Sequence, residues 1–383
     1  MKVLHLLASW KWTGPAEPAL EGAAVLARRP GVEVRVGLSS LQGRDQENQV
    51  EKEARRLGLE TLEGLKLPRH LNLAQLPGDV RRLAGILKEG RFDLVHCHTL
   101  VDHLSAALAR LAAGLHIPLV RTWYDPDGPS GSFRESWLVR SGLDGAVLPG
   151  SQAAGRLARK TKGRVKTRIL LPPVDLERFD PSLPAMRREY CCGEEDFILG
   201  VVARMQPHRR WDLLLAAFRR ALWKAPDLKL IVLGRGPGWE DLVFAPAGKM
   251  GLGDRLVLAG YRRGREFAAT LRTFDALVFL VPGSDGTCRA VRQAQAAGVP
   301  VLASRRGILP DLVEDGVDGI LVEEREEELA RAMAEIARDR ERARAMGEAA
   351  RRRAERDYAE SVFVEETLGL YREVLEGGGA CAG

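Results

Sequence analysis

The stretch PGSDGTCRAVRQAQAAGVPVLAS, residues 282–304, contains in order a loop, a short helix and a buried strand. Small residues and one carboxylate, Asp285, mark the loop, and the alanine-rich middle has the composition of a helix. The apolar run VPVLAS that follows is typical of a strand that is buried on both faces. Helices that feed directly into such strands are the repeating unit of α/β folds, so this stretch predicts a parallel sheet covered by helices.

The same alternation of apolar strand and helix continues on both sides of this stretch. The strand candidates before residue 172 are KVLHLLA, VEVRVGL, DLVHC, PLVRT and GAVLPG, and those after residue 195 include FILGVVA, LKLIVLG, RLVLAG, DALVFLV and GILV. The segment between the two groups is irregular and contains several prolines. Because 383 residues exceed what one hydrophobic core supports, we expect two doubly wound α/β domains, 1–173 and 174–358.

A final helix over about 359–378 carries an apolar stripe, so it must pack against another part of the protein. The stripe consists of Val362, Val364, Leu368, Leu370, Tyr371, Val374 and Leu375. The helices before it are strongly charged, and the spacing of their acidic and basic residues is typical of solvated helix faces.

Composition excludes several classes of protein. The five cysteines are scattered, which favours a reducing compartment over a disulfide framework. No stretch approaches the apolar length of a membrane span, and His5 in the opening run favours a first strand over a signal peptide. The net charge of +6 permits attraction to phosphates or anionic lipid without requiring it. We expect a cytoplasmic protein without a nucleic-acid partner, and GRGPG (234–238) lacks the spacing of a nicotinamide-binding fingerprint.

Polar and glycine residues gather where the strands of the second domain end. Arg204 follows FILGVVA, Gly236 follows LKLIVLG, and the loop with Asp285 follows DALVFLV. The carboxyl ends of parallel strands meet at one edge of the sheet, where open α/β sheets bind their ligands. A helix start attracts anions through its free N–H groups, and Arg204 and Arg209 add two permanent positive charges. The sequence therefore predicts a diphosphate cradle.

Several short motifs occur in the order found in one enzyme family. They are TGPAE at Thr13–Glu17, DLVHCH at Asp93–His98, VDLERF at Val174–Phe179, ARMQPHRRWDLLL, and a D-x7-Q pair followed by AQAAGVPVLAS. In these motifs the chain resembles the family 4 retaining glycosyltransferases of the GT-B fold. The resemblance implies two Rossmann-like domains facing a cleft: an acceptor-side domain, 1–173, to which the final helix returns, and a nucleotide-sugar-binding domain, 174–358.

The resemblance also implies roles for individual residues. The catalytic candidates are Arg204 and Arg209, which would hold the donor diphosphate, and Asp285, which would contact the donor sugar. The donor-binding candidates are Gly14, Gly236, Gly286, Thr287, Cys288 and Gln293, and the acceptor-side candidates are His98 and Tyr124. The implied enzyme transfers a sugar from a nucleotide-diphosphate-sugar to a glycan or lipid-linked acceptor in cell-envelope polysaccharide assembly. It retains the anomeric configuration by a front-face mechanism and requires neither a metal nor a cofactor.

Three residues depart from the family pattern. Tyr124 stands where the family usually has histidine, and Asp285 and Gln293 replace the two glutamates of an E-x7-E pair. An amide bonds ribose hydroxyls without the assistance of charge, so each of its hydrogen bonds is weaker. A second hypothesis therefore stays open, a catalytically weakened homologue that binds nucleotide or glycan as a partner protein. The sequence favours the enzyme because both cradle positions are basic.

The four main candidates also have purely structural interpretations. In these, Asp285 caps the helix that follows it, Arg204 and Arg209 are ordinary surface arginines, and Tyr124 packs in the core. The order of the motifs favours the functional interpretation for the arginines and for Asp285, and leaves Tyr124 undecided.

Two further features are weaker signals. His96, His98 and His103 suggest zinc, but no cysteine or glutamate lies at a usual ligand spacing, so we expect no metal. The basic segment 156–168 contains no acidic residue. It is either a solvated helix end and turn or a contact with anionic lipid, which would hold the protein at the inner face of the membrane.

Overall fold

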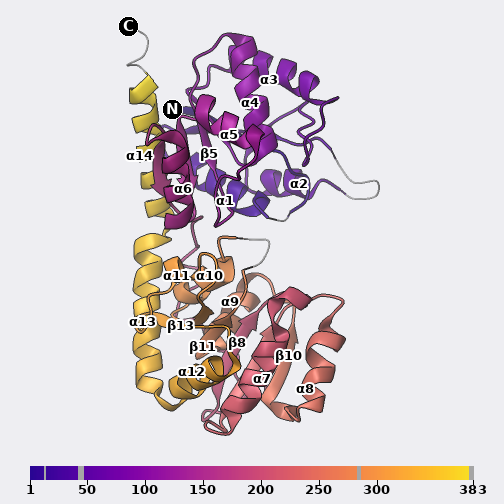
Figure 1. Ribbon diagram of the computed structural model, residues 1–383, viewed down its shortest axis with the longest axis vertical. Helices are drawn as coiled ribbons and strands as arrows, with labels where there is room; N and C mark the ends of the chain where they lie inside the picture. Colours follow the sequence, from indigo (N-terminus) through magenta and orange to yellow (C-terminus); the bar gives the residue numbers. More distant parts are fainter. Residues whose placement is uncertain (13, 42–46, 283–285, 379–383) are drawn as a thin grey trace. The chain divides into compact units, whose positions relative to one another are not determined.

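The computed structural model describes residues 1–12, 14–41, 47–282 and 286–378 (Figure 1). Within these ranges the chain divides into two compact α/β units. The first unit contains residues 1–173, 286–287 and 360–378, and the second contains residues 174–282 and 288–359. The sequence places Gly286 and Thr287 in the second domain, whereas their contacts group them with the first.

The first unit is built on a seven-stranded parallel sheet. Its strands are β1 (Lys2–Leu7), β2 (Glu33–Leu38), β3 (Glu60–Leu62), β4 (Leu94–Cys97), β5 (Leu119–Thr122), β6 (Gly145–Leu148) and β7 (Lys166–Ile169). They lie in the order β3-β2-β1-β4-β5-β6-β7. Its helices are α1 (Ala16–Ala27), α2 (Gln49–Arg56), α3 (Leu76–Gly90), α4 (Leu100–Ala113), α5 (Phe133–Ser141), α6 (Ser151–Thr161) and α14 (Glu360–Gly378).

The second unit is built on a six-stranded parallel sheet of order β10-β9-β8-β11-β12-β13. Its strands are β8 (Phe197–Val202), β9 (Leu228–Leu233), β10 (Leu256–Gly260), β11 (Ala276–Phe279), β12 (Val301–Ser304) and β13 (Gly319–Val322). Its α-helices are α7 (Trp211–Leu222), α8 (Ala245–Lys249), α9 (Gly264–Thr273), α10 (Arg289–Ala296), α11 (Leu309–Leu312), α12 (Glu326–Arg338) and α13 (Arg340–Asp357). Three further helical turns, which are not α-helical, are η1 (Pro207–Arg209), η2 (Glu240–Phe244) and η3 (Gly253–Arg255).

Burial follows the apolar pattern of the sequence. Every residue of β4, β5, β11 and β12 is buried, as expected for parallel strands covered on both faces. Helix α14 packs beside α1 and over β6 and β7. It contributes to the core of the first unit the side chains of Val364, Leu368, Leu370, Tyr371 and Val374. The predicted burial of the apolar stripe is therefore confirmed, and the hydrophobic effect ties the last helix to the first unit.

The basic segment 156–168 contains the predicted helix end and turn, and also the start of a strand that the sequence analysis does not predict. Helix α6 ends at Thr161, a turn follows at residues 162–163, and the residues from Lys166 onward form β7. This strand pairs with β6, whose backbone supplies its hydrogen bonds. The partner strand lies outside the local sequence, so a local pattern could not reveal the pairing. Among the described residues, no helix is both long and apolar enough to span a membrane.

Each sheet reverses its strand order at one point. In the first sheet β1 pairs with both β2 and β4, and in the second sheet β8 pairs with both β9 and β11. In open α/β sheets the loops after the two strands on either side of such a reversal lead away in opposite directions, and ligands bind between them. Residues that follow β1, β4, β8 and β11 are accordingly the first places to look for ligand contacts.

Candidate functional site

Arg204 and Arg209 lie at the strand-order reversal of the second sheet. β8 ends at Val202, Arg204 is exposed in the loop that follows, and Arg209 is the last residue of η1. Arg209 Nη1 donates a hydrogen bond of 2.6 Å to the carbonyl oxygen of Val281, just beyond β11. One guanidinium thus joins the ends of the two strands between which the order reverses, and both arginines lie at the ligand-binding edge of the sheet.

The positive charges of this pair have no ionic partner in the part of the chain that the structure describes. Burial lowers the pKa of the Arg209 guanidinium; the Cys288 thiol opposes this shift, and the nearby charge of Arg204 adds to it. No described carboxylate forms an ion pair with either arginine. Two like charges held close together create a strongly positive potential, and a bound anion relieves their repulsion. The arrangement is therefore suited to a multiply charged anion such as a diphosphate.

A small cavity beside Arg209 is not the place for that anion. Two buried donors without a described partner, Arg209 Nε and Trp211 Nε1, belong to residues that line a cavity of about 20 Å³. A cavity of this size has room for a single water molecule. A diphosphate is too large for it, so an anion would meet the pair on the side where Arg204 is exposed.

Glycines bring the loop after β9 against the loop that carries Arg204. A Cβ atom on Gly234 would lie 1.8 Å from the carbonyl oxygen of Ala203, and one on Gly236 would lie 3.1 Å from the amide nitrogen of Met205. Gly236 also has a φ of +156°, a conformation that side chains disfavour. The structure thus gives Gly236 a packing reason as well as its predicted place at a strand end.

Gly286 and Thr287, which come shortly before α10 in the sequence, pack within the first unit. Gly286, Thr287 and Cys288 are all buried, and Cys288 precedes α10 with a left-handed φ of +49°. A Cβ atom on Gly286 would lie 2.4 Å from the carbonyl oxygen of Tyr124 and 2.6 Å from Cδ of Pro126. The sequence analysis explains Gly286 by the close approach of a diphosphate. In the structure, the group that lies this close to Gly286 is the backbone of Tyr124.

The structure describes only one residue of the D-x7-Q pair, Gln293. Asp285 lies outside the described residues. Gln293 lies on α10 with its side chain half-buried, between the buried residues Arg292 and Ala294. Gln295, two positions on, is fully buried and donates from Nε2 to the carbonyl oxygen of Leu312. Of the two glutamines on this helix, Gln293 is therefore the one with side-chain surface left for a ligand.

His98 and Tyr124, the acceptor-side candidates, lie together at the carboxyl ends of β4 and β5. His98 Nδ1 and the Tyr124 hydroxyl are 2.8 Å apart, within hydrogen-bonding distance. Burial lowers the pKa of His98 well below its usual range, so the imidazole is neutral near pH 7. Gly14 also belongs to the first unit, in the turn before α1, where its left-handed φ of +62° suits glycine.

Asp102 organises this edge of the first sheet, although the sequence analysis does not single it out. Its carboxylate accepts hydrogen bonds from the backbone nitrogens of Ala8, His98 and Thr99, at 2.9–3.1 Å. One side chain on α4 thus holds the ends of β1 and β4 together. Burial raises the pKa of Asp102 to about 6, against these hydrogen bonds. The pair Thr99 and Asp102 forms a capping box, and this three-residue spacing is the signal that the sequence offers.

The histidines group differently from the combination considered in the sequence. His103 Nε2 bonds the carbonyl oxygen of Gly142, 3.0 Å away, so its place with His96 and His98 is wrong. His5 on β1 takes that place, and the ring nitrogens of His5, His96 and His98 lie within 4.8 Å of one another. The sequence analysis misses His5 as a site residue because nothing local links β1 to β4.

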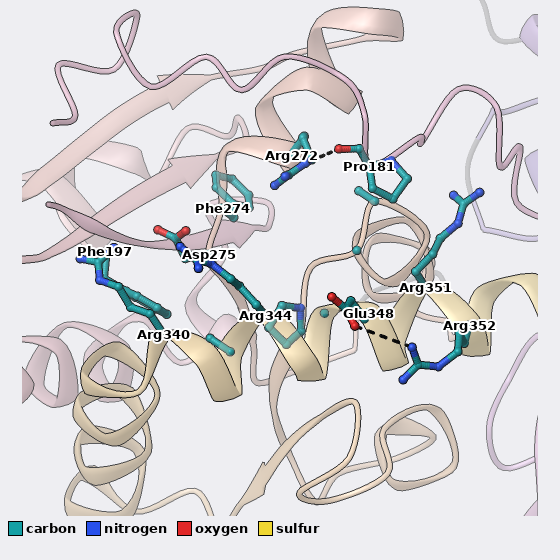
Figure 2. Close-up of a pocket in the computed structure, with 15 residues that line it drawn as sticks. Pro181, Phe197, Arg272, Phe274, Asp275, Arg340, Arg344, Glu348, Arg351 and Arg352 are labelled. Atoms are coloured by element: carbon teal, nitrogen blue, oxygen red, sulfur yellow. Dashed lines mark hydrogen bonds and ion pairs between the residues drawn. The ribbon is translucent and has the colours of Figure 1, made fainter. Parts of the chain in front are cut away.

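A pocket of about 480 Å³ lies at the opposite edge of the second sheet, where β8, β11 and β12 begin (Figure 2). Arginine side chains surround it, but most are already engaged. Arg272 donates to the carbonyl oxygen of Pro181, and Arg351 donates to that of Ala296. Because ligands of open α/β sheets bind at the carboxyl ends of the strands, we do not assign this pocket to the site.

Two family models match the chain. Residues 20–178 match the model described as Glycosyltransferase Family 4, and residues 184–353 match the model described as Glycosyl transferases group 1. The D-inositol 3-phosphate glycosyltransferase of Actinosynnema mirum is 30% identical over 302 residues, 70% of this chain and 71% of the relative. The protein of the same name from Kribbella flavida is 30% identical over 325 residues, 78% of this chain and 75% of the relative.

Solved structures of similar fold cover nearly the whole chain. The Anabaena protein HepE, solved in complex with UDP, has a TM-score of 0.79 at 20% identity and covers 96% of this chain and 99% of its own. A glycosyltransferase from Rickettsia africae has a TM-score of 0.81 at 18% identity and covers 98% of both chains. These likenesses confirm the predicted GT-B fold. The family models and the relatives show that the chain belongs to glycosyltransferase family 4 and is a hexosyltransferase-type enzyme.

Proposed function

We propose that this glycosyltransferase moves a sugar from a nucleotide-diphosphate-sugar donor to a glycan or lipid-linked acceptor. One observation carries the proposal: Arg204 and Arg209 lie together at the strand-order reversal, with no carboxylate partner among the described residues. A diphosphate offers the negative charge and the several oxygens that two planar guanidinium groups can bond. The donor diphosphate is therefore the ligand that this edge of the second sheet suits best.

The proteins compared above suggest which donors and acceptors to test first. HepE was solved with UDP and also with UDP-glucose. The two relatives are named for D-inositol 3-phosphate. For this chain we propose UDP-linked hexoses as the first donors, and D-inositol 3-phosphate as a comparison acceptor beside glycans and lipid-linked sugars. We further place the reaction in cell-envelope polysaccharide assembly, in the cytoplasm at the inner face of the membrane.

The proposed reaction retains the anomeric configuration by a front-face path. Arg204 and Arg209 would stabilise the negative charge that grows on the leaving diphosphate. That diphosphate would take the proton from the acceptor hydroxyl, so the protein's part is to hold the reactants and to stabilise charge. Because the two arginines supply this positive charge themselves, we propose a reaction that does not depend on a metal or a cofactor.

The remaining contacts divide between the two reactants. On the donor side, Gln293 would bond the ribose hydroxyls and Asp285 the sugar, with backbone contacts from the candidate glycines, Thr287 and Cys288. On the acceptor side, the hydrogen-bonded pair His98 and Tyr124 would meet the incoming hydroxyl. Gly14 would let the first-unit loop approach the donor phosphates.

Calorimetry with UDP, GDP and ADP tests the diphosphate site directly. We expect Arg204→Ala to weaken binding of the preferred diphosphate by about 1.5–3 kcal/mol, the range for hydrogen bonds to charged groups. Arg219→Ala is the matched control, because Arg219 is another exposed arginine of the same unit. Unchanged affinity in a folded Arg204→Ala variant would remove this residue from the site, and absence of binding by the wild type to all three nucleotides would overturn the proposal.

A catalytically weakened homologue is the second candidate function, favoured by Tyr124 and Gln293, which depart from the family pattern. Both candidates bind the nucleotide, so binding does not distinguish them. Turnover does, and hydrolysis of UDP-glucose without acceptor measures it. Release of UDP above the background rate supports the enzyme, whereas tight binding without hydrolysis or transfer supports a binding partner.

A further inference from the structure

A continuous series of hydrogen-bonding groups runs through the interior of the first unit. It begins at the partly exposed Tyr124, passes through three histidine rings and one buried tyrosine hydroxyl, and ends at a threonine on β5. In order, its members are Tyr124, His98, His5, Tyr371, His96 and Thr122. The side chains come from β1, from β4 and β5 and the loops directly after them, and from α14, so only the folded unit brings them together.

The distances along this series are short at every link but one. From the Tyr124 hydroxyl to His98 Nδ1 is 2.8 Å, and from His98 Nε2 to His5 Nδ1 is 3.0 Å. His5 Nε2 is 3.5 Å from the Tyr371 hydroxyl, which is the longest link. The Tyr371 hydroxyl is 2.5 Å from His96 Nδ1, and His96 Nε2 is 2.7 Å from Thr122 Oγ1. Every ring nitrogen of the three histidines is therefore used.

Burial keeps the three imidazoles neutral, so each carries one N–H and one bare nitrogen. Desolvation lowers the pKa of His5 to about 3 and lowers the pKa values of His96 and His98 well below their usual range. A neutral imidazole with two bonded nitrogens must donate through one and accept through the other. If a ring accepts a hydrogen bond from one neighbour in the series, it must therefore donate one to its other neighbour, so all the bonds of the series point the same way.

Only two proton arrangements satisfy the whole series. In one, Tyr124 donates to His98 and all three histidines carry their proton on Nε2. In the other, Thr122 donates to His96 and all three carry it on Nδ1. A mixed arrangement would leave the Tyr371 proton without an acceptor, leave a bare nitrogen beside Tyr371 without a donor, or set two N–H groups or two bare nitrogens of His5 and His98 against each other. Each of these costs a buried hydrogen bond.

We propose that this series acts as one polarised hydrogen-bond chain that sets the proton on the Tyr124 hydroxyl. When the histidines are protonated on Nε2, Tyr124 uses its proton inside the chain and offers only lone pairs to an acceptor substrate. When they are protonated on Nδ1, His98 donates to the Tyr124 hydroxyl, whose own proton then points out of the chain. Tyr371 and His5 are then positioning residues for the acceptor, an inference that rests on the proposed function of Tyr124.

The same three histidines are the one described group with spacing suited to a metal ion. Hydrogen-bond geometry favours the chain over a metal centre. His5 Nδ1 and His98 Nε2 are 3.0 Å apart and serve as each other's hydrogen-bond partners, the N–H of one facing the lone pair of the other. His96 directs both nitrogens elsewhere, to Tyr371 and Thr122.

Nitrogen NMR of the full chain, labelled with ¹⁵N-histidine, tests the chain without any substrate. We expect His5, His96 and His98 to show the same tautomer in the wild type, either all Nε2–H or all Nδ1–H. Tyr371→Phe removes the hydroxyl that links His96 to His5. In this variant the tautomer of His96 should no longer have to match the tautomer of His5 and His98. Mixed tautomers in the wild type, or an imidazolium at any of the three, would overturn the proposal.

Thr367→Val is the matched control, since Thr367 is another buried hydroxyl of α14, whose oxygen has no described partner. It should leave all three tautomers unchanged. Addition of Zn²⁺ is a further arm: binding that is lost in His5→Gln would identify a metal centre and overturn the chain.

Steady-state kinetics tests the effect on the acceptor. We expect Tyr371→Phe to lower kcat/KM for the acceptor roughly fivefold, the equivalent of one neutral hydrogen bond, with KM for the donor unchanged. Thr367→Val should leave both values at the wild-type level. Equal losses of kcat/KM in the two variants would mean that Tyr371 acts only through its packing in the core and would overturn its role as a positioning residue. If the wild type turns over no donor, the proposed function fails, while the tautomer result still decides whether the chain exists.

Discussion

Arg209 performs two tasks because its guanidinium is a planar fork with several donors. Nη1 is bonded to the carbonyl oxygen of Val281, which fixes the side chain across the ends of β8 and β11. Donors on the same group remain for a ligand. A lysine at this position would bring a point charge on a flexible stem. Arginine at this position therefore keeps the charge of the cradle and adds a link between two strands.

Gln293 is the residue where the departure from the family pattern is easiest to test. If it faces the ribose, Gln293→Glu should bind the nucleoside diphosphate as tightly as the wild type or several-fold tighter, because charge-assisted hydrogen bonds are roughly twice as strong. Repulsion between the new carboxylate and the diphosphate opposes this gain, and the two arginines offset most of it. Gln293→Ala should bind more weakly than either, as measured by calorimetric titration.

Gln152→Ala supplies the control for that titration, since Gln152 is exposed on α6 of the other unit. It should leave the affinity for the nucleotide unchanged. If Gln293→Ala binds as well as the wild type, Gln293 does not touch the ribose, and the alignment of the D-x7-Q pair to the family motif is incorrect.

Among the helices, α13 can pack closely against the turn that follows α10 because Gly347 has no side chain. A Cβ atom on Gly347 would lie 2.3 Å from the carbonyl oxygen of Gly298, so the two backbones are in direct contact. We expect Gly347→Ala to lower the free energy of unfolding by about 1–3 kcal/mol, the usual cost of overpacking. Urea denaturation of the purified variant measures the change.

Gly85→Ala is the counterpart on α3, where a Cβ atom would meet nothing within 4 Å. Alanine is the better helix former, so this variant should gain about 0.5–1 kcal/mol of stability. The same substitution should thus have opposite signs in two helices. Equal stability of the two variants would show that α13 and the turn have room to separate.

The basic segment 156–168 is less available to a membrane than its sequence suggests. Arg156 pairs with Asp127 and Arg168 pairs with Glu366, both at 3.0 Å, and Arg164 donates to backbone carbonyls. Three of its cations are exposed and have no described partner, namely Arg159, Lys162 and Lys166. Any contact with anionic lipid therefore depends on these three.

Replacement of these three residues by glutamine should weaken binding to phosphatidylglycerol vesicles by about 1 kcal/mol for each charge. Binding by the wild type should also fall as salt is added, because exposed charges are screened. The control replaces three exposed cations of the second unit, Arg219, Lys224 and Lys249. Equal loss in both triple variants, or no binding by the wild type, would leave the segment as solvated surface.

Over the whole molecule, buried neutral histidines make stability depend on pH. Burial lowers the pKa values of His5 and His103 to about 3, and those of His96 and His98 well below the 6.5 of an unfolded histidine. Below pH 6.5 the unfolded chain binds protons at these positions and the folded chain does not. Their contribution to stability is therefore complete above pH 6.5 and is lost as the pH falls.

We expect the free energy of unfolding to drop by about 1 kcal/mol for each of the four histidines between pH 7.5 and pH 5.5. Asp102 acts in the opposite direction. Its folded pKa of about 6 lies above its ordinary 3.8, so its protonation on acidification returns up to about 1 kcal/mol. Urea denaturation at the two pH values measures the sum. His103→Gln should remove about a quarter of the dependence, and a flat profile would contradict neutral, buried histidines.

The sequence by itself determined the class of the fold and the sheet edge at which we propose the donor site. Apolar runs alternating with helices predict parallel sheets, because each strand must be covered on both faces. Arg204 comes just after the strand β8 in the sequence, so the direction of the chain alone places it at the carboxyl edge of the second sheet. The apolar stripe on α14 likewise required burial, and Tyr371 within it is fully buried.

Only the tertiary structure decided which side chains meet. Tyr371 and His5 are 366 positions apart, and no local pattern links α14 to the ring of a histidine on β1. The same holds for Gly286, whose missing side chain admits the backbone of Tyr124, and for β7, which exists because β6 offers it hydrogen bonds. Periodicity reports which face of an element is buried, because burial depends on one residue's own polarity. It does not report the partner, because pairing depends on the shapes and hydrogen-bonding groups of two distant segments at once.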